Sequence, residues 1–245
     1  MSKEPEIKKS IPREILEWIV CIVVAFVLAV IIKYFIFTPT LVLQTSMYPT
    51  IFSGDRVFVN RLTRTFSLPI ERGDIVTLEK PNVEILDPEQ IANGEIKAQY
   101  SQHSGLEWFT YNMLEWGKVS YIKRVIGLSG DHILIDDEGN VFVNDEKIDE
   151  TSYLPDGTIT PHAYGEGGIK NDFIVPAGYV FAMGDNRGGS LDCRRFGCVP
   201  IEKVEGKVLF RLWPLSRFGA ITKSTMTAKE VDENLNQMRL NRYFE

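Results

Sequence analysis

Cysteine and histidine are scarce in this sequence, which has three of each among its 245 residues. Three cysteines are too few for a disulfide scaffold. None of the histidines has the spacing of a metal-binding motif, so we expect no metal site and no cofactor. Basic residues are also in deficit, and a net charge of -6 argues against nucleic acid as a partner, because nucleic acid needs a basic face. No internal repeat is visible.

Long apolar runs are absent as well, with one exception near the N-terminus. From Ile15 to Phe37 the only charged residues are Glu17 and Lys33. As a helix this stretch would reach about 34 Å, enough to cross a hydrocarbon core of roughly 30 Å. Trp18 and Tyr34 would then lie near the two lipid interfaces. We therefore predict a transmembrane helix over residues 15–37, embedded in a lipid bilayer.

A cleaved secretory signal and a buried helix of a soluble protein are the alternatives. A cleavage site would need small residues after the apolar run, whereas Phe35-Ile36-Phe37-Thr38-Pro39 stands there. We therefore expect an uncleaved single span. The polar lead, residues 1–14, has four basic residues against three acidic ones, a bias that predicts a cytoplasmic N-terminus and an extracytoplasmic body.

Short β-like runs dominate residues 38–222, and the chain is long enough for one sizeable core besides the span. The runs are bounded by Gly, Asp and Pro without ten-residue helical patterns between them, which predicts a mostly β domain of antiparallel, barrel-like sheet. Residues 137–140, Asp-Glu-Gly-Asn, predict a hairpin turn. The expected strands are Leu41–Leu43, Arg56–Asn60, Asp74–Leu78, Ser120–Gly127, His132–Ile135, Val141–Asn144, Tyr179–Met183 and Lys207–Leu212.

Two segments depart from this pattern. Residues 81–118 form an insertion with a polar first half and an aromatic stretch at 108–116. We expect either a short helix that caps the sheet or aromatic side chains that dip into the lipid interface. The tail, residues 223–245, has apolar residues at helical spacing, which predicts an amphipathic helix docked on the body.

Ser46 follows the apolar run by nine residues, so it stays near the membrane if that run is a span. A serine before a turn-setting proline is weak evidence by itself, because most such serines only bond the local backbone. A catalytic serine needs a base that takes its proton. Lys123 is the best candidate, because strand alternation places it on the face of Tyr121 and Val125, where lost solvation lowers the pKa of a lysine.

Two alternatives to a Ser-Lys pair remain. Lys123 could be an ordinary strand lysine whose amine reaches solvent. A Ser-His-Asp set could use His132 and Asp131 instead. His132, however, opens a plainly alternating strand, and Asp131 follows a glycine in what looks like the preceding turn. We therefore favour Lys123 as the base.

Four motifs occur along the chain around these residues. They are Ser46-Met47-x-Pro49-Thr50, Gly54-Asp55-x-Val57-x-Val59, Tyr121-Ile122-Lys123-Arg124-x-x-Gly127-x-x-Gly130-Asp131 and Gly184-Asp185-Asn186-Arg187-x-x-Ser190-x-Asp192-x-Arg194-x-x-Gly197. In this order they closely resemble the conserved boxes of bacterial type I signal peptidases. The resemblance implies a membrane-bound serine endopeptidase that removes signal peptides from secretory preproteins on the outer side of the cytoplasmic membrane.

The resemblance also implies roles for single residues. Ser46 would be the nucleophile and Lys123 the general base, and Ser190 would hydrogen-bond and orient the lysine amine. The preprotein would bind as an extended strand between the strand before the serine and the strand that carries the lysine. Small pockets that select Ala-x-Ala would be shaped by Val42, Met47, Ile51, Tyr121 and Ile122.

Ion pairs would brace the site in such a protein, namely Arg124 with Asp185 and Arg194 with Asp192. The chain departs from the family's pattern at two positions. Gln44 stands two residues before Ser46, where many relatives have a serine in the oxyanion hole, and its side-chain amide would donate instead. Cys193 stands where a serine is usual. It could pair with Cys198, but we favour free thiols.

Two other classes of protein compete with this interpretation. A membrane-anchored β module that only binds a partner would need none of the four motifs. A self-cleaving repressor-type protease shares the Ser-Lys pair but carries a DNA-binding helical region where this chain has its apolar run. Neither explains the four motifs together, and the sequence predicts no particular oligomeric state.

Overall fold

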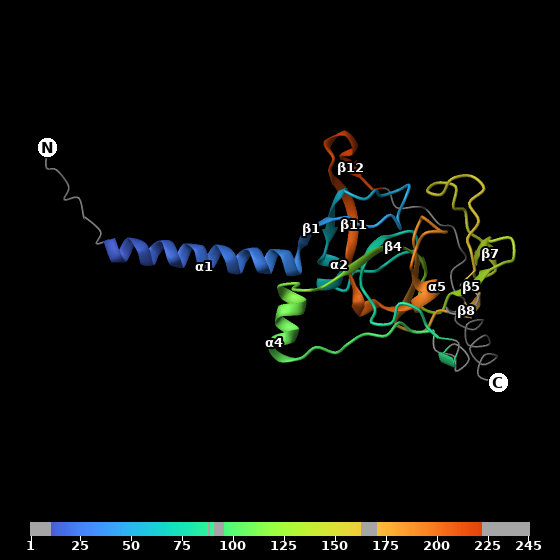
Figure 1. Ribbon diagram of the computed structural model, residues 1–245, viewed down its shortest axis with the longest axis horizontal. Coiled ribbons are helices and arrows are strands. Elements are labelled where there is room, and N and C mark those ends of the chain that lie inside the picture. Colours follow the sequence, from blue (N-terminus) through green and yellow to red (C-terminus); the bar gives the residue numbers. More distant parts are fainter. Residues whose placement is uncertain (1–10, 88, 91–95, 163–170, 222–245) are drawn as a thin grey trace.

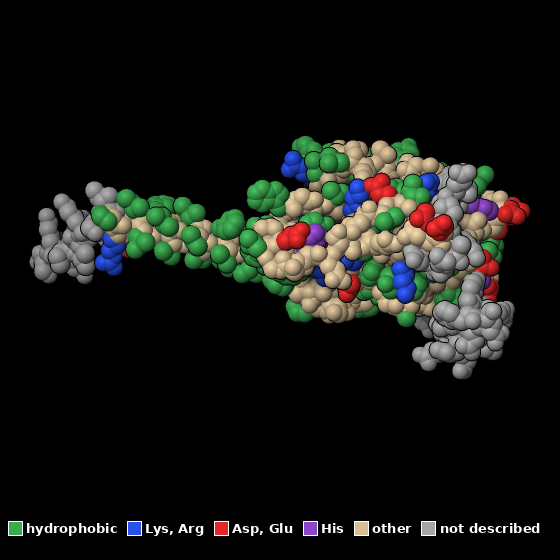
Figure 2. Space-filling view, turned by 60° about the horizontal axis from the view of Figure 1, so that its bottom comes forward, with side chains coloured by type: hydrophobic (Ala, Val, Ile, Leu, Met, Phe, Trp, Pro, Cys, Tyr) green, Lys and Arg blue, Asp and Glu red, His purple; other side chains and the backbone are tan. Residues whose placement is uncertain are grey.

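A long helix projects from a body built of strands in the computed structural model, which describes residues 11–87, 89–90, 96–162 and 171–221 (Figure 1). The helix, α1 (Ile11–Phe35), is long and apolar enough to cross a membrane. Figure 2 shows hydrophobic side chains along α1, with a basic side chain at its N-terminal end. The helix begins four residues before the predicted span, 15–37, and ends two residues before the predicted end. Pro12 fits the first turn, where its missing N–H costs nothing, and Phe37 already belongs to the first strand.

Two antiparallel sheets make up the body. The larger, curled sheet has the strand order β1-β2-β11-β3-β4-β9-β10, with β12 paired to β11, and the smaller has the order β7-β6-β5-β8. The predicted mostly β, barrel-like fold is therefore confirmed. The strands are β1 (Phe37–Leu41), β2 (Arg56–Asn60), β3 (Ile75–Glu79), β4 (Ser120–Gly127), β5 (His132–Ile135), β6 (Val141–Val143), β7 (Glu146–Lys147), β8 (Asp172–Ile174), β9 (Tyr179–Met183), β10 (Val199–Pro200), β11 (Val204–Trp213) and β12 (Gly219–Ala220).

Several predicted strands have the observed bounds, among them β2, β4, β5 and β9, and residues 137–140 form the predicted turn between β5 and β6. The strand predicted at Leu41–Leu43 is wrong, because β1 ends at Leu41. Val42 bonds instead to the backbone of the turn before β2, through Asp55 and Gly54. The strands that were missed, β7, β8, β10 and β12, are two or three residues long and too short to show an alternating pattern.

Short helices and helical turns lie in the segments that connect the strands. They are α2 (Leu62–Thr65), α4 (Gly105–Trp108), the π-helical turn η1 (Phe109–Met113), α5 (Cys193–Phe196) and the 3₁₀ turns η2 (Ile201–Lys203) and η3 (Leu215–Arg217). The insertion first runs beside α5, where Leu86 N–H donates to the Arg195 carbonyl. It then reaches α4 and η1. The predicted tail helix, 223–245, lies outside the described residues.

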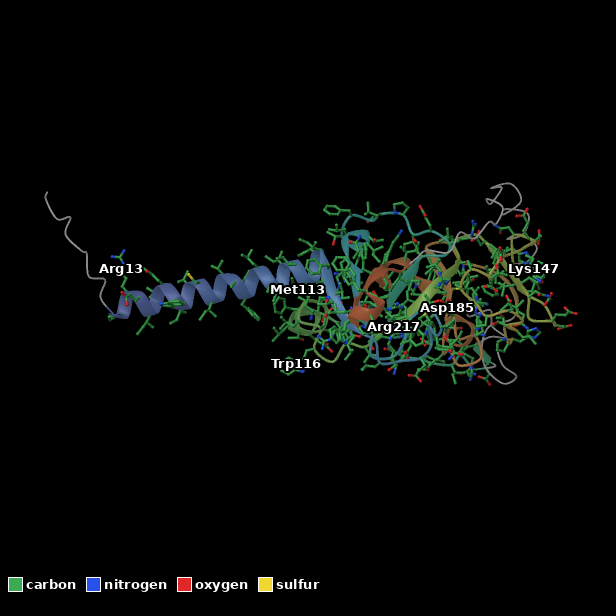
Figure 3. All side chains as sticks on the ribbon, turned by 90° about the horizontal axis from the view of Figure 1, so that it is seen from above. Arg13, Met113, Trp116, Lys147, Asp185 and Arg217 are labelled. Atoms are coloured by element: carbon green, nitrogen blue, oxygen red, sulfur yellow. The ribbon has the colours of Figure 1, made fainter. Side chains whose placement is uncertain are left out.

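The aromatic part of the insertion packs against the end of α1. The rings of Tyr34 and Trp108 lie 6.4 Å apart, edge to face. Figure 3 places Met113 beside this end of α1 and shows Trp116 pointing away from the body. The predicted short helix is thus present, but it contacts α1 instead of capping a sheet.

The junction between α1 and the sheet is tight, because only Ile36 separates α1 from β1. The last carbonyls of a helix lack partners within it. Here two of them accept from α2: Arg64 Nη2 donates to the Tyr34 carbonyl and Thr65 Oγ1 to the Phe35 carbonyl, each at 2.6 Å. These bonds fix the direction in which α1 leaves the body.

A small apolar cluster supports the loop that follows β1. Its buried members are Val42, Met47, Ile51, Val57, Val59, Ile75, Ile122 and Val208. Burying one such side chain contributes roughly 1.5–3 kcal/mol. The cluster therefore holds the turn around Ser46 against the sheet, while a second, larger core fills the space between the sheets and α5.

Candidate active site

Ser46 and Lys123 are brought together as the sequence predicted. Ser46 lies in the turn after β1, and its carbonyl accepts from Asn186 N–H at 3.0 Å. Lys123 projects from the middle of β4 and is fully buried. Its Nζ donates to Ser46 Oγ at 2.8 Å. A hydroxyl and an amine in direct contact can exchange a proton.

The environment of Lys123 makes its amine a weak base. Burial lowers its pKa from 10.5 to about 8, although the carboxylate of Asp192 works in the opposite direction. The ring of Tyr121 lies 5.3 Å from Nζ, so the two side chains share the face that strand alternation predicted. The amine is therefore largely neutral in mild alkali.

Arg124 points to the other side of β4 and forms the predicted ion pair with Asp185. Its Nε and Nη2 donate to the two carboxylate oxygens at 2.9 and 2.8 Å. Thr50 Oγ1 donates to the same carboxylate at 2.6 Å, which ties the Ser46 turn to the pair. Both charged groups are buried, so removing one partner would cost about 3–5 kcal/mol.

Asp192 and Arg194 form the second predicted ion pair. Arg194 Nε and Nη2 each donate to the carboxylate at 2.8 Å, and Gly184 N–H donates to it at 3.0 Å. Burial alone would raise the pKa of Asp192, but the Arg194 guanidinium holds it below its ordinary value. The carboxylate is therefore charged and fixes the Gly184 backbone.

Ser190 does not make the predicted hydrogen bond to the lysine amine. Its Oγ is buried and has no hydrogen-bond partner among the described residues. It lies instead against Gly184, where a Cβ would come 2.2 Å from Ser190 Oγ and 2.4 Å from the Ser46 carbonyl. Only glycine fits at this position, a requirement that the sequence signalled only as a glycine within a motif.

A cleft of about 390 Å³ opens beside Ser46. It lies between β1 and the start of β4, and both strands have an unpaired edge. Among the described residues β1 pairs only with β2, and β9 pairs with β4 only from Arg124 onward. Two strand edges with free backbone groups therefore border the cleft, as an added peptide strand would require.

The predicted pocket residues divide into two groups. Val42, Met47 and Ile122 line the cleft. Ile51 and Tyr121 do not. Ile51 is fully buried beneath the Ser46 turn, and the ring of Tyr121 stacks on Phe196 at 6.1 Å. Gln44 also lines the cleft, and its side chain is exposed there.

The histidine alternative finds no support in the geometry. His132 lies in the smaller sheet, where its ring nitrogens contact Asp145 at 3.0 Å and Asp172 at 2.7 Å. Asp131 pairs with Arg72 instead. The described residues contain no group of three His, Cys, Asp or Glu side chains that could hold a metal ion.

Cys193 and Cys198 are free thiols, the alternative that we favoured. Burial raises the pKa of both thiols well above the ordinary value, so neither is a reactive thiolate.

Asp55 was quoted in a motif without a role, and the structure supplies one. Arg211 and Arg217 donate to its two carboxylate oxygens at 2.8 and 2.9 Å. Arg211 also donates to the Thr50 carbonyl at 2.5 Å. These bonds attach the loop that contains Ser46 to strand β11. The only sequence signal was a charged residue after Gly54 in a turn.

A serine hydroxyl held against a buried, weakly basic amine on a mostly β body is an arrangement that fits the class of serine peptidases. The chain belongs to the signal peptidase family, peptidase S26, whose model matches residues 15–213. Members of this family cleave signal peptides from preproteins, and that is the reaction of this chain.

Two relatives identified by sequence agree with this assignment. The chain is 32% identical to signal peptidase I of Bacillus licheniformis over 220 residues, which cover 88% of this chain and 97% of that one. It is 31% identical to signal peptidase IB of Staphylococcus aureus (strain COL) over 217 residues, 84% and 93% of the two chains. A crystal structure of a signal peptidase I from Enterococcus faecalis V583 aligns at 20% identity with a TM-score of 0.32, covering 57% of this chain and 96% of that chain.

Proposed function

We propose that this chain is a membrane-anchored signal peptidase in which Ser46 is the nucleophile and Lys123 the general base. The observation that carries the proposal is the 2.8 Å contact between Ser46 Oγ and the Nζ of a fully buried lysine. The neutral amine takes the hydroxyl proton as Oγ attacks the scissile carbonyl carbon, and it then gives that proton to the leaving amine. The same amine activates the water that hydrolyses the acyl-enzyme.

The membrane part of the proposal rests on α1. This helix crosses the cytoplasmic membrane with its N-terminus inside, so that the body lies on the outer side. The single residue between α1 and β1 keeps the cleft close to the lipid surface. An exported preprotein whose apolar segment still lies in the bilayer can therefore reach Ser46.

The substrate specificity follows from the lining of the cleft. Val42, Met47 and Ile122 fill the wall next to Ser46 with bulky apolar groups. An extended peptide that bonds to the edges of β1 and β4 brings its backbone close to this wall, which leaves room only for small side chains. Ala-x-Ala sites satisfy this requirement.

We expect cleavage to require small residues at positions -1 and -3 of the preprotein. The test incubates the purified full-length chain in detergent with preproteins that differ only at -1, and maps each cut by mass spectrometry. Alanine at -1 should give a single cut after it, and phenylalanine should reduce kcat/KM by at least about 10²-fold, since a clash in a filled pocket costs several kcal/mol. Equal processing of both substrates would favour a broad protease instead.

Gln44 is proposed as an oxyanion donor beside the Ser46 backbone N–H. Its exposed side chain lines the cleft, so its amide can reach the developing negative charge. Gln44→Ala should lower kcat by about 10²-fold with little change in KM, the usual cost of losing one such donor. The neighbouring Thr45→Ala is a matched control, because Thr45 is exposed but does not line the cleft. An unchanged kcat in Gln44→Ala would assign the second donor elsewhere.

A further inference from the structure

The cleft continues beyond the small-residue pockets to the last turn of α1, and its lining there is charged. Lys33, Arg61, Glu115, Lys118 and Glu205 all line it. Lys33 belongs to α1, and Glu115 and Lys118 belong to the insertion. None of these residues lies in the four sequence motifs, so the catalytic machinery does not account for them.

Glu115 holds this end of the cleft together. Its carboxylate accepts from Lys33 Nζ at 2.6 Å and also contacts Arg61 Nη2. Burial would raise the pKa of Glu115, but Lys33 and Arg61 hold it below its ordinary value, so the group is charged at neutral pH.

Lys118 pairs with Glu205 at 2.7 Å. Lys118 also pairs with Glu79, but Glu79 is paired in turn with Lys203, so these two add no net charge. The three cations and two carboxylates that line this end therefore leave a surplus of one positive charge.

Arg61 also has an unpaired hydrogen-bond donor among the described residues. The side chain is 4% exposed, and its Nε has no hydrogen-bond partner among the described residues. A buried donor without a partner is costly. An acceptor on a bound peptide would satisfy it, which is a second reason to expect a ligand at this end.

Geometry decides which part of a preprotein would lie there. The apolar segment of a signal peptide lies in the bilayer, and the cut follows it in sequence. Because α1 marks the bilayer, the peptide must enter at the α1 end and present its later residues to Ser46. An extended peptide advances about 3.3 Å per residue. Lys118, at the charged end, precedes Lys123 by five residues, and the chain between them is extended and hydrogen-bonded along β3 as far as Val119. A peptide beside β4 therefore meets the charged end about six residues before the cut.

We propose that Lys33, Arg61 and Glu115 form an upstream subsite that selects the charge of the substrate residue about six positions before the cut. The inference rests on the proposed function and deepens it. An acidic residue matches the surplus positive charge and supplies an acceptor to Arg61, whereas a lysine adds a like charge. A leucine would desolvate the charged lining without giving it a partner.

Two substitutions change the surplus charge in opposite directions. Lys33→Met removes it, and Glu115→Gln raises it from one to two while keeping the size of the side chain. The measurement is the ratio of kcat/KM for a preprotein with Asp at -6 to that for the same preprotein with Lys at -6, using full-length enzyme in detergent. We expect the ratio to rise from Lys33→Met through wild type to Glu115→Gln, by about threefold or more at each step, and to shrink in high salt.

Matched controls separate this effect from a general loss of structure. Glu107→Gln removes a carboxylate from α4 that is exposed and does not line the cleft. Lys147→Met removes a lysine at the end of the body opposite α1, as Figure 3 shows. Both should keep the wild-type ratio, as should the conservative Lys33→Arg. When the Asp and Lys are placed at +6 of the preprotein instead of -6, the ratio of kcat/KM should be the same in Lys33→Met, wild type and Glu115→Gln.

The outcomes are distinguishable. If Glu115→Gln and Lys33→Met slow all substrates alike and leave the ratio unchanged, the cluster is only structural and the subsite is overturned. A ratio that falls in Glu115→Gln would also overturn it. Failure of the proposed function looks different, because then no preprotein is cut at a defined site or cutting survives in Ser46→Ala.

Discussion

Ser46→Ala and Lys123→Met should each abolish preprotein processing, with an expected loss of about 10⁴-fold or more in kcat. The first removes the proposed attacking atom, and the second removes the only group among the described residues that contacts that atom and can take its proton. Methionine replaces a buried lysine with an apolar side chain of similar length, so the fold should persist. The measurement is single-turnover cleavage followed on gels, with near-native circular dichroism as the check of folding.

Non-additivity makes this prediction specific. If the two groups act as one unit, the double variant should be no slower than either single variant. Ser53→Ala and Lys203→Met are matched controls, because Ser53 only donates to the Leu43 carbonyl and Lys203 pairs with Glu79 away from Ser46. Both should retain activity. Substantial turnover in either Ser46→Ala or Lys123→Met would rule out the Ser-Lys mechanism.

The contact between Ser46 and Lys123 could be predicted from the sequence because local rules govern β4. Its bounds were predicted correctly, and a period of two puts Lys123 and Arg124 on opposite faces, where they meet Ser46 and Asp185. The same rule did not predict correctly whether Tyr121 lines the cleft. Tyr121 shares the face of Lys123, but whether a residue on that face lines the cleft or packs on Phe196 depends on how the sheet curls.

Other parts of the site could not be predicted, because they join segments far apart in the chain. Glu115, near the end of the insertion, pairs with Lys33 of α1, which lies 82 residues earlier in the chain, and no local pattern marks that contact. Ile51 was predicted to line a pocket because it is close to Ser46 in the sequence, yet the turn buries its side chain completely. β1 was misplaced because Phe37 and Leu41 remain partly exposed and Pro39 interrupts the run, as happens on edge strands.

Activity should rise steeply with pH through the neutral range. A general base works only when unprotonated, so the acidic limb of kcat/KM against pH reports its pKa in the free enzyme. Burial disfavours the charged form of Lys123 and brings its pKa down to about 8. The active, neutral amine therefore accumulates as pH rises, and kcat/KM should increase about tenfold per pH unit up to about 8 and then level off. Initial rates with one preprotein across this range measure the limb.

The variant His132→Ala separates the two candidate bases. A histidine base would place the limb near 6.5, the ordinary value for that side chain. His132 lies in the smaller sheet between two carboxylates, so its removal should leave the limb where it was. Lys123→Met, in contrast, should remove the limb together with the activity, because no other amine contacts Ser46 Oγ among the described residues. A limb near 6.5 that disappears in His132→Ala would transfer the role of base to the histidine and leave the burial of Lys123 without a function.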